Sequence, residues 1–335
     1  MKRRNFLHTA WGLGATAGLG AVSAAGWRQH QPAALHWRSR SLLGFGTALS
    51  LQVAHDSGLL AEQALDEAIA TLRHVEGLMS LFKPDSALSQ LNRDGVLQHP
   101  HADLVQILTT AQDVSQRSGG AFDVTVQPLW TVFDEAARRQ TLPTTAALAS
   151  ARAAVGWQKL TVAPEQIRLE HPGMGVTLNG IAQGFAADLV KARLQALGVR
   201  HALVNTGEWA HLGQSQRGQP WVLGVANPLN ESSLLARLAL AGRSLATSAD
   251  NACHFSDDKL HHHIFNPHTG DSPTELAGVS VVASSCVMAD ALTKVMFVAG
   301  ADQALRLAPQ WGVDVMVVKK DGSWEATPGL AVLTT

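Results

Sequence analysis

The sequence predicts a single α+β domain, in which helices and strands alternate irregularly within one folded unit. Segments with a helical period and segments with a strand period are intermixed, but no regular strand–helix–strand rhythm appears, which argues against a doubly wound parallel sheet. Of the 335 residues, 46% are hydrophobic and 16% are charged, so the chain can bury a sizeable core. The formal net charge of −1 gives no electrostatic support for binding nucleic acid or an acidic membrane surface.

The beginning of the chain is expected to be an export signal and not part of this domain. Arg3 and Arg4 form a twin-arginine pattern ahead of a weakly hydrophobic stretch rich in glycine and alanine. The glycines make that stretch a poor membrane-spanning helix. We therefore expect a cleaved twin-arginine signal peptide at 1–25, a linker at 26–41 and the folded domain at 42–335, with the mature protein in the periplasm.

The first half of the expected domain combines short strands with amphipathic helices. Residues 59–80 place leucine, isoleucine, valine and alanine on one face at helical spacing. Gly119 and Gly120 end a second helix, because glycine is unfavourable inside helices. The elements expected here are a strand at 42–53, helices at 59–80 and 102–118, a helical turn from Pro84, a strand at 121–126, a small helix within 140–154, and a hairpin at 160–162 and 167–169.

Residues 176–188, with the sequence VTLNGIAQGFAAD, form the central stretch around which the rest is organised. Its start has the apolar, β-branched character of a strand end, and a helix follows until Gly198. Gly180 and Gly184 leave the first helical turn without bulky side chains, so another backbone or a ligand can approach closely. Two alternatives remain open: a tight packing turn, or a helix start that binds a phosphate.

The remainder of the chain is predicted to be mainly strands, with one further helix. The helix at 287–299 ends at Gly300, and a turn follows the last long strand at 320–322. The expected strands lie at 202–205, 221–226, 235–240, 279–283 and 313–319. Cys253 and Cys286 could form a disulfide only if the fold brings them together.

Five stretches carry a more specific signal when they are taken together and in order. They are MSLFKPDSALSQLN (79–92), GGAFDVTVQPL (119–129), VTLNGIAQGFAADL (176–189), HHIFNPHTG (262–270) and ADALTKVMFVAG (289–300). This ordered set resembles the ApbE family, the FAD:protein FMN transferases, over residues 42–333. Any one stretch is weak evidence, but the order of all five is hard to obtain by chance. The twin arginines, Gly207-Glu208 and residues 247–249 look most like the exported, NosX-type branch.

The resemblance implies a fold, a reaction and a set of partners. The fold would be one ApbE-like, T-fold-like domain with flavin in a cleft beside the central stretch. The reaction would cleave FAD as substrate and attach FMN to a threonine of an acceptor flavoprotein, a periplasmic or membrane-bound redox partner. The cofactor would be Mg²⁺ or Mn²⁺, since phosphoryl transfer needs neutralisation of charge on the diphosphate.

The resemblance also assigns roles to individual residues. His263 would be the base toward the acceptor threonine, and near-neutral titration suits a histidine to that role. The metal would be held by the carbonyl of Gly180, by Asp290 and by Thr293, which offer hard oxygen ligands. Contacts with the flavin and adenosine fall on Phe45, Phe82, Ala121, Phe122, Asp123, Thr177, Gln183 and Ile264. Asp123 has a structural alternative as a turn residue, and the two phenylalanines at 82 and 122 have one as core residues.

The sequence departs from the family pattern at the expected metal and phosphate positions. Lys294 stands where the family has a threonine that helps to hold the metal, and Gln183 replaces a lysine. Thr177 and Phe82 replace an aspartate and a tyrosine. Lys294 could replace the charge of the metal, so the alternative is a periplasmic flavin-binding or flavin-delivery protein with weak or no transferase activity.

A third hypothesis concerns the histidines, of which the chain has 15. His261, His262 and His263 could join His254 in a transition-metal site. Consecutive histidines on a strand point to opposite faces, so at most two of the three could converge. This hypothesis predicts stoichiometric transition metal without flavin.

Overall fold

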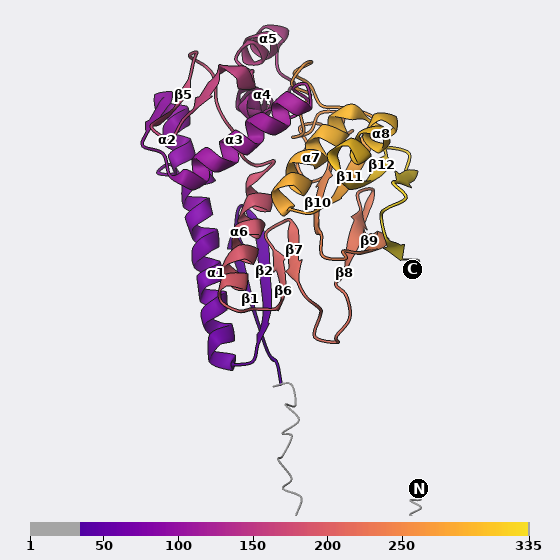
Figure 1. Cartoon of the computed structure of the whole chain (residues 1–335). Helices are drawn as coiled ribbons and strands as arrows, with labels where there is room; N and C mark the ends of the chain where they lie inside the picture. The colour runs from indigo at the N-terminus through magenta and orange to yellow at the C-terminus, as the bar shows by residue number, and fades with distance from the viewer. Residues whose placement is uncertain (1–33, 334–335) are drawn as a thin grey trace, which may run out of the picture. The chain divides into compact units, whose positions relative to one another are not determined.

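The computed structural model describes residues 34–333, and its main feature is an eight-stranded sheet in which every neighbouring pair is antiparallel (Figure 1). In spatial order the strands are β1 (His36–Gly44), β2 (Thr47–His55), β6 (His201–Asn205), β7 (Trp209–Leu212), β10 (Ser244–Ala249), β11 (Leu276–Ala283), β12 (Asp314–Lys319) and β13 (Trp324–Ala326). All eight residues of β11 are buried, so both faces of the sheet are covered at its centre.

Four helices cover one face of this sheet in succession. They are α1 (Gly58–Met79), α6 (Ala182–Ala196), α7 (Cys286–Ala299) and α8 (Ala301–Trp311). The first lies against β1 and β2, the next against β6 and β7, and the last two against β10, β11 and β12 (Figure 1). Their apolar faces join the sheet in the main hydrophobic core, because amphipathic helices bury one face.

A small sheet covers part of the opposite face. Its strands are β8 (Val222–Asn227), β9 (Asn230–Ala239) and β14 (Val332–Leu333), in the order β14-β9-β8. Leu223 and Leu238 of this sheet join Leu245, Val282 and Met316 of the main sheet in a second core. The main sheet is therefore the middle of three layers in this region.

The remaining elements form a group at one end of α1. These are α2 (Ala87–Asp94), α3 (Ala102–Arg117), α4 (Gln127–Ala137) and α5 (Thr145–Ala153), with the 3₁₀ turns η1 (Val124–Val126) and η2 (Trp157–Lys159) and the small sheet of β3 (Val96–Gln98), β4 (Leu160–Val162) and β5 (Gln166–Leu169) (Figure 1). No helix in the described residues is long and apolar enough to cross a membrane.

The predicted α+β class is confirmed, and so are most of the long elements. Helices predicted at 59–80, 102–118 and 287–299 are α1, α3 and α7, and the hairpin at 160–169 is β4 and β5. The expected signal peptide at 1–25 and most of the expected linker lie outside the described residues. Residues 36–41 belong to β1, so this part of the linker prediction is wrong.

The strand predicted at 42–53 is in fact a hairpin. Phe45 and Gly46 form its turn between β1 and β2, with φ angles of 52° and 76°. Two successive residues with positive φ suit a tight hairpin, because the twist of such a turn matches that of the strands. Phenylalanine rarely adopts this conformation, so a turn at Phe45 was not predicted.

Two further strand predictions were wrong for a shared reason. At 121–126 the side chain of Asp123 caps the 3₁₀ turn η1, and residues 176–178 belong to no strand. In both places side-chain hydrogen bonds replace a strand ladder. Helices α4 and α8 were not predicted, although Pro128 at the start of α4 is a typical helix-start residue.

Candidate active site

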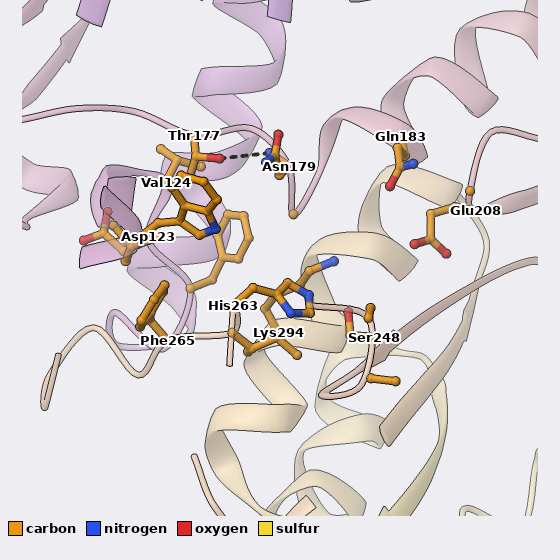
Figure 2. Close-up of a pocket in the computed structure, with 18 of the residues that line it drawn as sticks. Asp123, Val124, Thr177, Asn179, Gln183, Glu208, Ser248, His263, Phe265 and Lys294 are labelled. Carbon is orange, nitrogen blue, oxygen red and sulfur yellow. Dashed lines mark hydrogen bonds between the residues drawn. The ribbon is translucent and has the colours of Figure 1, made fainter. Parts of the chain in front are cut away.

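A cavity of about 470 Å³ opens where segments far apart in the sequence meet (Figure 2). Its volume lies within the range of small-molecule pockets. The walls come from the β1–β2 turn, from residues 121–126, from 177–183, from the β6–β7 turn, from β10, from 263–267 and from α7. The main sheet and its helices therefore determine where the site forms.

The central stretch is held in place by a side chain from α2. Asn92 accepts a hydrogen bond from the backbone N–H of Val176 at 2.7 Å and donates one to its carbonyl at 2.8 Å. The next N–H, of Thr177, binds the carbonyl of Val124 at 2.8 Å. These bonds give the backbone N–H and carbonyl groups of this segment partners, although the segment pairs with no strand. Thr177 Oγ1 also accepts from the N–H of Asn179 at 3.3 Å, at the edge of the cavity (Figure 2).

The two glycines of the central stretch serve different contacts. A Cβ at Gly184 would lie 2.4 Å from the carbonyl oxygen of Cys286, so this glycine allows α6 and α7 to pack closely. Gly180 lines the cavity, and a Cβ there would lie 3.1 Å from Cε of Lys294. The packing-turn interpretation is confirmed for Gly184, whereas Gly180 borders the cavity.

A carboxylate from α6 fixes the start of α7. Asp188 accepts from the backbone N–H groups of Cys286 and Val287, each at 2.9 Å. Burial raises the pKa of this carboxyl, although both hydrogen bonds favour its charged form. The first turn of α7 is therefore capped from the neighbouring helix, which sets the position of the next two turns, where Asp290 and Lys294 lie.

Asp290 is fully buried and both its carboxylate oxygens are engaged. Oδ2 accepts from the backbone N–H of Gly184 at 3.0 Å, and Oδ1 accepts from Nζ of Lys294 at 2.5 Å. The same ammonium also donates to the carbonyl of Asp290 at 3.2 Å. Thr293, also buried, donates to that carbonyl at 2.6 Å and shares a hydrogen bond with Ser248 at 2.7 Å. The hydroxyl of Thr293 thus faces β10.

These contacts decide whether the predicted metal ligands fit a divalent ion. Asp290, Thr293 and the carbonyl of Gly180 are oxygen donors of the kind that Mg²⁺ prefers. However, the ammonium of Lys294 occupies the carboxylate oxygen that such an ion would need, and Thr293 and Asp290 do not line the cavity. In this arrangement the residues do not fit a divalent metal.

A second buried carboxyl lies near this pair. Glu208, in the β6–β7 turn, lines the cavity and accepts from the backbone N–H of Thr247 at 3.0 Å. Burial raises its pKa well above the usual range, and the charge of Asp290 raises it further, while Lys294 acts in the opposite direction. Glu208 therefore holds its proton more readily than an ordinary carboxyl group.

His263 has its protonation pattern fixed by a single hydrogen bond. Nδ1 lies 2.9 Å from the carbonyl oxygen of Cys253, and a carbonyl can only accept, so Nδ1 carries the proton. Nε2 of the neutral ring is then the free basic nitrogen. Burial, together with the nearby charges of His262 and Lys294, lowers the pKa of His263 to about 4. The ring is a neutral base at neutral pH.

The other histidines of this run bind separate partners. His261 Nδ1 pairs with Asp271 at 2.9 Å, and His262 Nε2 with the carbonyl of Pro273 at 2.9 Å. Among the described residues, the one group of metal-ligating side chains close enough to share an ion is His74, His101 and Asp103, and none of them lines the cavity. The predicted transition-metal cluster around the histidine run does not form. Both cysteines are free thiols.

The predicted flavin contacts fall into two groups. The cavity is lined by Ala121, Phe122, Asp123, Thr177, Gln183 and Ile264. Phe45 and Phe82 are not among its lining residues, and Phe82 is 72% exposed.

Asp123 has a structural role as well. Its oxygens accept from the backbone N–H and the hydroxyl of Thr125 and from the N–H of Trp157. Asp123 is thus a turn residue, as the alternative interpretation of the sequence predicted, and it also borders the cavity.

Several lining residues had no predicted role. Trp130 was missed together with α4, and Phe265 follows the predicted histidine motif. Glu208 and Ser248 lie in stretches that were used only as markers of a branch. The motifs identified segments that line the cavity. Which residues of each segment face the cavity depends on burial and on contacts across the sheet.

The comparison with known proteins agrees with these motifs. The model of the ApbE family matches residues 45–317. The chain belongs to the ApbE family. The FAD:protein FMN transferase of Haemophilus influenzae is 31% identical over 297 residues, which cover 83% of this chain and 86% of that protein. The FAD:protein FMN transferase of Vibrio cholerae is 29% identical over 291 residues, or 84% and 87% of the two chains.

Solved structures of ApbE proteins share this fold. The flavin transferase ApbE from Vibrio cholerae superposes with a TM-score of 0.78 at 24% identity, covering 88% of this chain and 98% of that one. The ApbE protein of Thermotoga maritima gives a TM-score of 0.79 at 21% identity, covering 88% and 97%. The predicted ApbE-like domain is therefore confirmed as a fold.

Proposed function

We propose that this protein is an FAD:protein FMN transferase. The observation that carries the proposal is one cavity that brings together residues from the ApbE motifs, including Thr177, Gln183 and His263. The relatives that match most of the chain bear the name of this activity. The substrate would be FAD, and the acceptor a threonine of a partner flavoprotein.

The geometry of His263 suits the proton transfer that this reaction requires. The hydroxyl oxygen of the acceptor threonine attacks the phosphorus on the FMN side of FAD and forms a new phosphoester bond. The bond from that phosphorus to the bridging oxygen breaks, and AMP leaves with the electron pair. The hydroxyl proton passes to Nε2 of His263, while the hydrogen bond from Nδ1 to Cys253 keeps the ring in the correct tautomer.

The residues expected to bind a divalent metal already have other partners. The family resemblance predicts Mg²⁺ or Mn²⁺ at Gly180, Asp290 and Thr293, but the ammonium of Lys294 and the hydroxyl of Ser248 already engage the last two. We therefore assign no step of the reaction to a metal.

The twin-arginine pattern supports a proposal for the location, and the family resemblance supports one for the partner. We propose export by the twin-arginine route to the periplasm, in the NosX-type branch, with a periplasmic or membrane-bound redox subunit as acceptor. The twin arginines Arg3 and Arg4 support this proposal. Replacing both with lysine should leave the protein in the cytoplasmic fraction of cells, as detected by immunoblotting after fractionation. Unchanged periplasmic recovery would contradict the proposed route.

The transfer reaction can be tested directly. Purified protein is mixed with FAD and an acceptor that carries a flavinylation-motif threonine, and a denaturing gel is inspected for flavin fluorescence. We expect a fluorescent acceptor band, weakened by about 10²–10⁴-fold in His263→Ala through loss of the base. His254→Ala, at an exposed position outside the cavity, is the matched control and should be unaffected. FAD binding without any labelled acceptor would favour the flavin-delivery alternative.

A further inference from the structure

We propose that Lys294 is the resident cation of the diphosphate site, so that this protein binds FAD without a divalent metal ion. The inference takes FAD as the ligand from the proposed function. It concerns the chemistry that recognises the diphosphate.

Lys294 is fixed in position by its contacts with Asp290 and Gly180. An ammonium group has three donors, and two of them bind Asp290, at Oδ1 and at the backbone carbonyl. The aliphatic part of the side chain lies against Gly180, where any side chain would press on Cε. The lysine is thus held against the wall of the cavity, and its side chain is only 18% exposed.

The cavity has few cationic side chains. Among the described residues that line it, Lys294 is the one lysine or arginine. His263, which lies nearby in Figure 2, is neutral at neutral pH because burial lowers its pKa to about 4. A diphosphate that enters the cavity therefore meets one ammonium group, which is paired with Asp290 on α7 and keeps an N–H able to donate to a phosphate oxygen.

The side chains expected to bind the metal are engaged with other partners. A magnesium ion lies about 2.1 Å from its ligand oxygens and would compete with the ammonium for Asp290. Thr293 offers no replacement, because its hydroxyl is bonded to Ser248 and to the backbone of its own helix. Lys294 thus replaces a metal ligand of the family pattern and supplies a positive charge in its place.

The test measures FAD binding by fluorescence titration in EDTA and in Mg²⁺. For the wild-type protein we expect dissociation constants that agree within about twofold. Lys294→Thr should bind FAD about 10–100-fold more weakly in EDTA, because a charged hydrogen bond is lost, and Mg²⁺ should restore the binding. Lys191→Thr is the control, since it removes a half-buried lysine of α6 that does not line the cavity.

Electron paramagnetic resonance of Mn²⁺ gives an independent readout. The wild-type protein should leave Mn²⁺ free, and Lys294→Thr should bind it. The wild-type measurements decide the question even if Lys294→Thr folds poorly with Asp290 unpaired. FAD binding by the wild type that EDTA abolishes, or stoichiometric Mn²⁺ binding by the wild type, would overturn the inference.

Running the transfer assay on the same samples separates the two proposals. FAD binding and transfer that both require Mg²⁺ would refute the role of Lys294 and leave the transferase function intact. Metal-independent FAD binding without transfer would support the role of Lys294 and refute the transferase function.

Discussion

At the scale of single residues, hydrogen bonds to backbone groups determine the chemistry of the site. The carbonyl of Cys253 assigns the proton of His263 to Nδ1 and leaves Nε2 as the base. Asn92 holds the central stretch through the two backbone groups of Val176. Neither partner is adjacent in sequence to the group that it orients, so the fold must form before the site exists.

The environment of His263 predicts a specific pH dependence. Only the neutral ring accepts a proton, and the neutral fraction falls as pH drops through the pKa, which burial lowers from 6.5 to about 4. We expect kcat/KM for flavin transfer to show no loss between pH 8 and about 5 that is due to this residue, and to decline near pH 4. The profile is measured in buffers of constant ionic strength. An acid limb near 6.5 would show that His263 is solvated like an ordinary histidine.

At the scale of elements, the close contact between α6 and α7 positions the cavity wall. Asp188 caps α7, and Gly184 donates its N–H to Asp290. The contact brings the central stretch against the turn of α7 that carries Lys294. Any change in the spacing of these helices should therefore affect both stability and the site.

Two glycine substitutions test this contact. Gly184→Ala would place a methyl group 2.4 Å from a backbone oxygen of α7, and we expect it to lower the free energy of unfolding by about 1–3 kcal/mol. Gly77→Ala, at an exposed position in α1 with open space around it, should instead raise that free energy by about 0.5–1 kcal/mol. Urea unfolding followed by circular dichroism measures both. Equal effects of the two substitutions would contradict the role of Gly184.

The same elements show how far the sequence could predict the fold. Helices such as α1 and α7 have a clear apolar period and were predicted within one or two residues. The hairpin at Phe45 was missed because phenylalanine is not a typical turn residue. The first part of β1 was also missed, because residues 36–41 were expected to belong to the linker. The segment at 176–178 has the composition of a strand but is held by Asn92, which lies 84 residues away from Val176. Long-range side-chain contacts of this kind leave no local pattern.

The sequence predicted which segments form the site better than it predicted which residues line it. The motifs identified segments around Phe122, Thr177 and His263 that line the cavity. They also pointed to Phe82, which is exposed because it lies in the turn between α1 and α2. The ion pair of Lys294 with Asp290 follows from their spacing of four residues on α7, but its burial depends on α6.

At the scale of the described fold, the antiparallel sheet with its covering helices gathers the ApbE motifs around one cavity (Figure 1). No single segment supplies the cation, the base and the walls. Lys294 comes from α7, His263 from the loop after β10, and Gly180 from the segment before α6. We propose that this cavity takes the diphosphate of FAD and that the acceptor protein supplies the attacking hydroxyl.

The most direct test of this account is the intact mass of an acceptor protein after incubation with FAD and this protein, with AMP measured in the same reaction. We predict an acceptor that is heavier by one FMN less one water, with one AMP released for each labelled acceptor, and no mass change when the acceptor threonine is replaced by alanine. An acceptor of unchanged mass in both EDTA and Mg²⁺, alongside FAD that binds but stays intact, would contradict the proposed transfer.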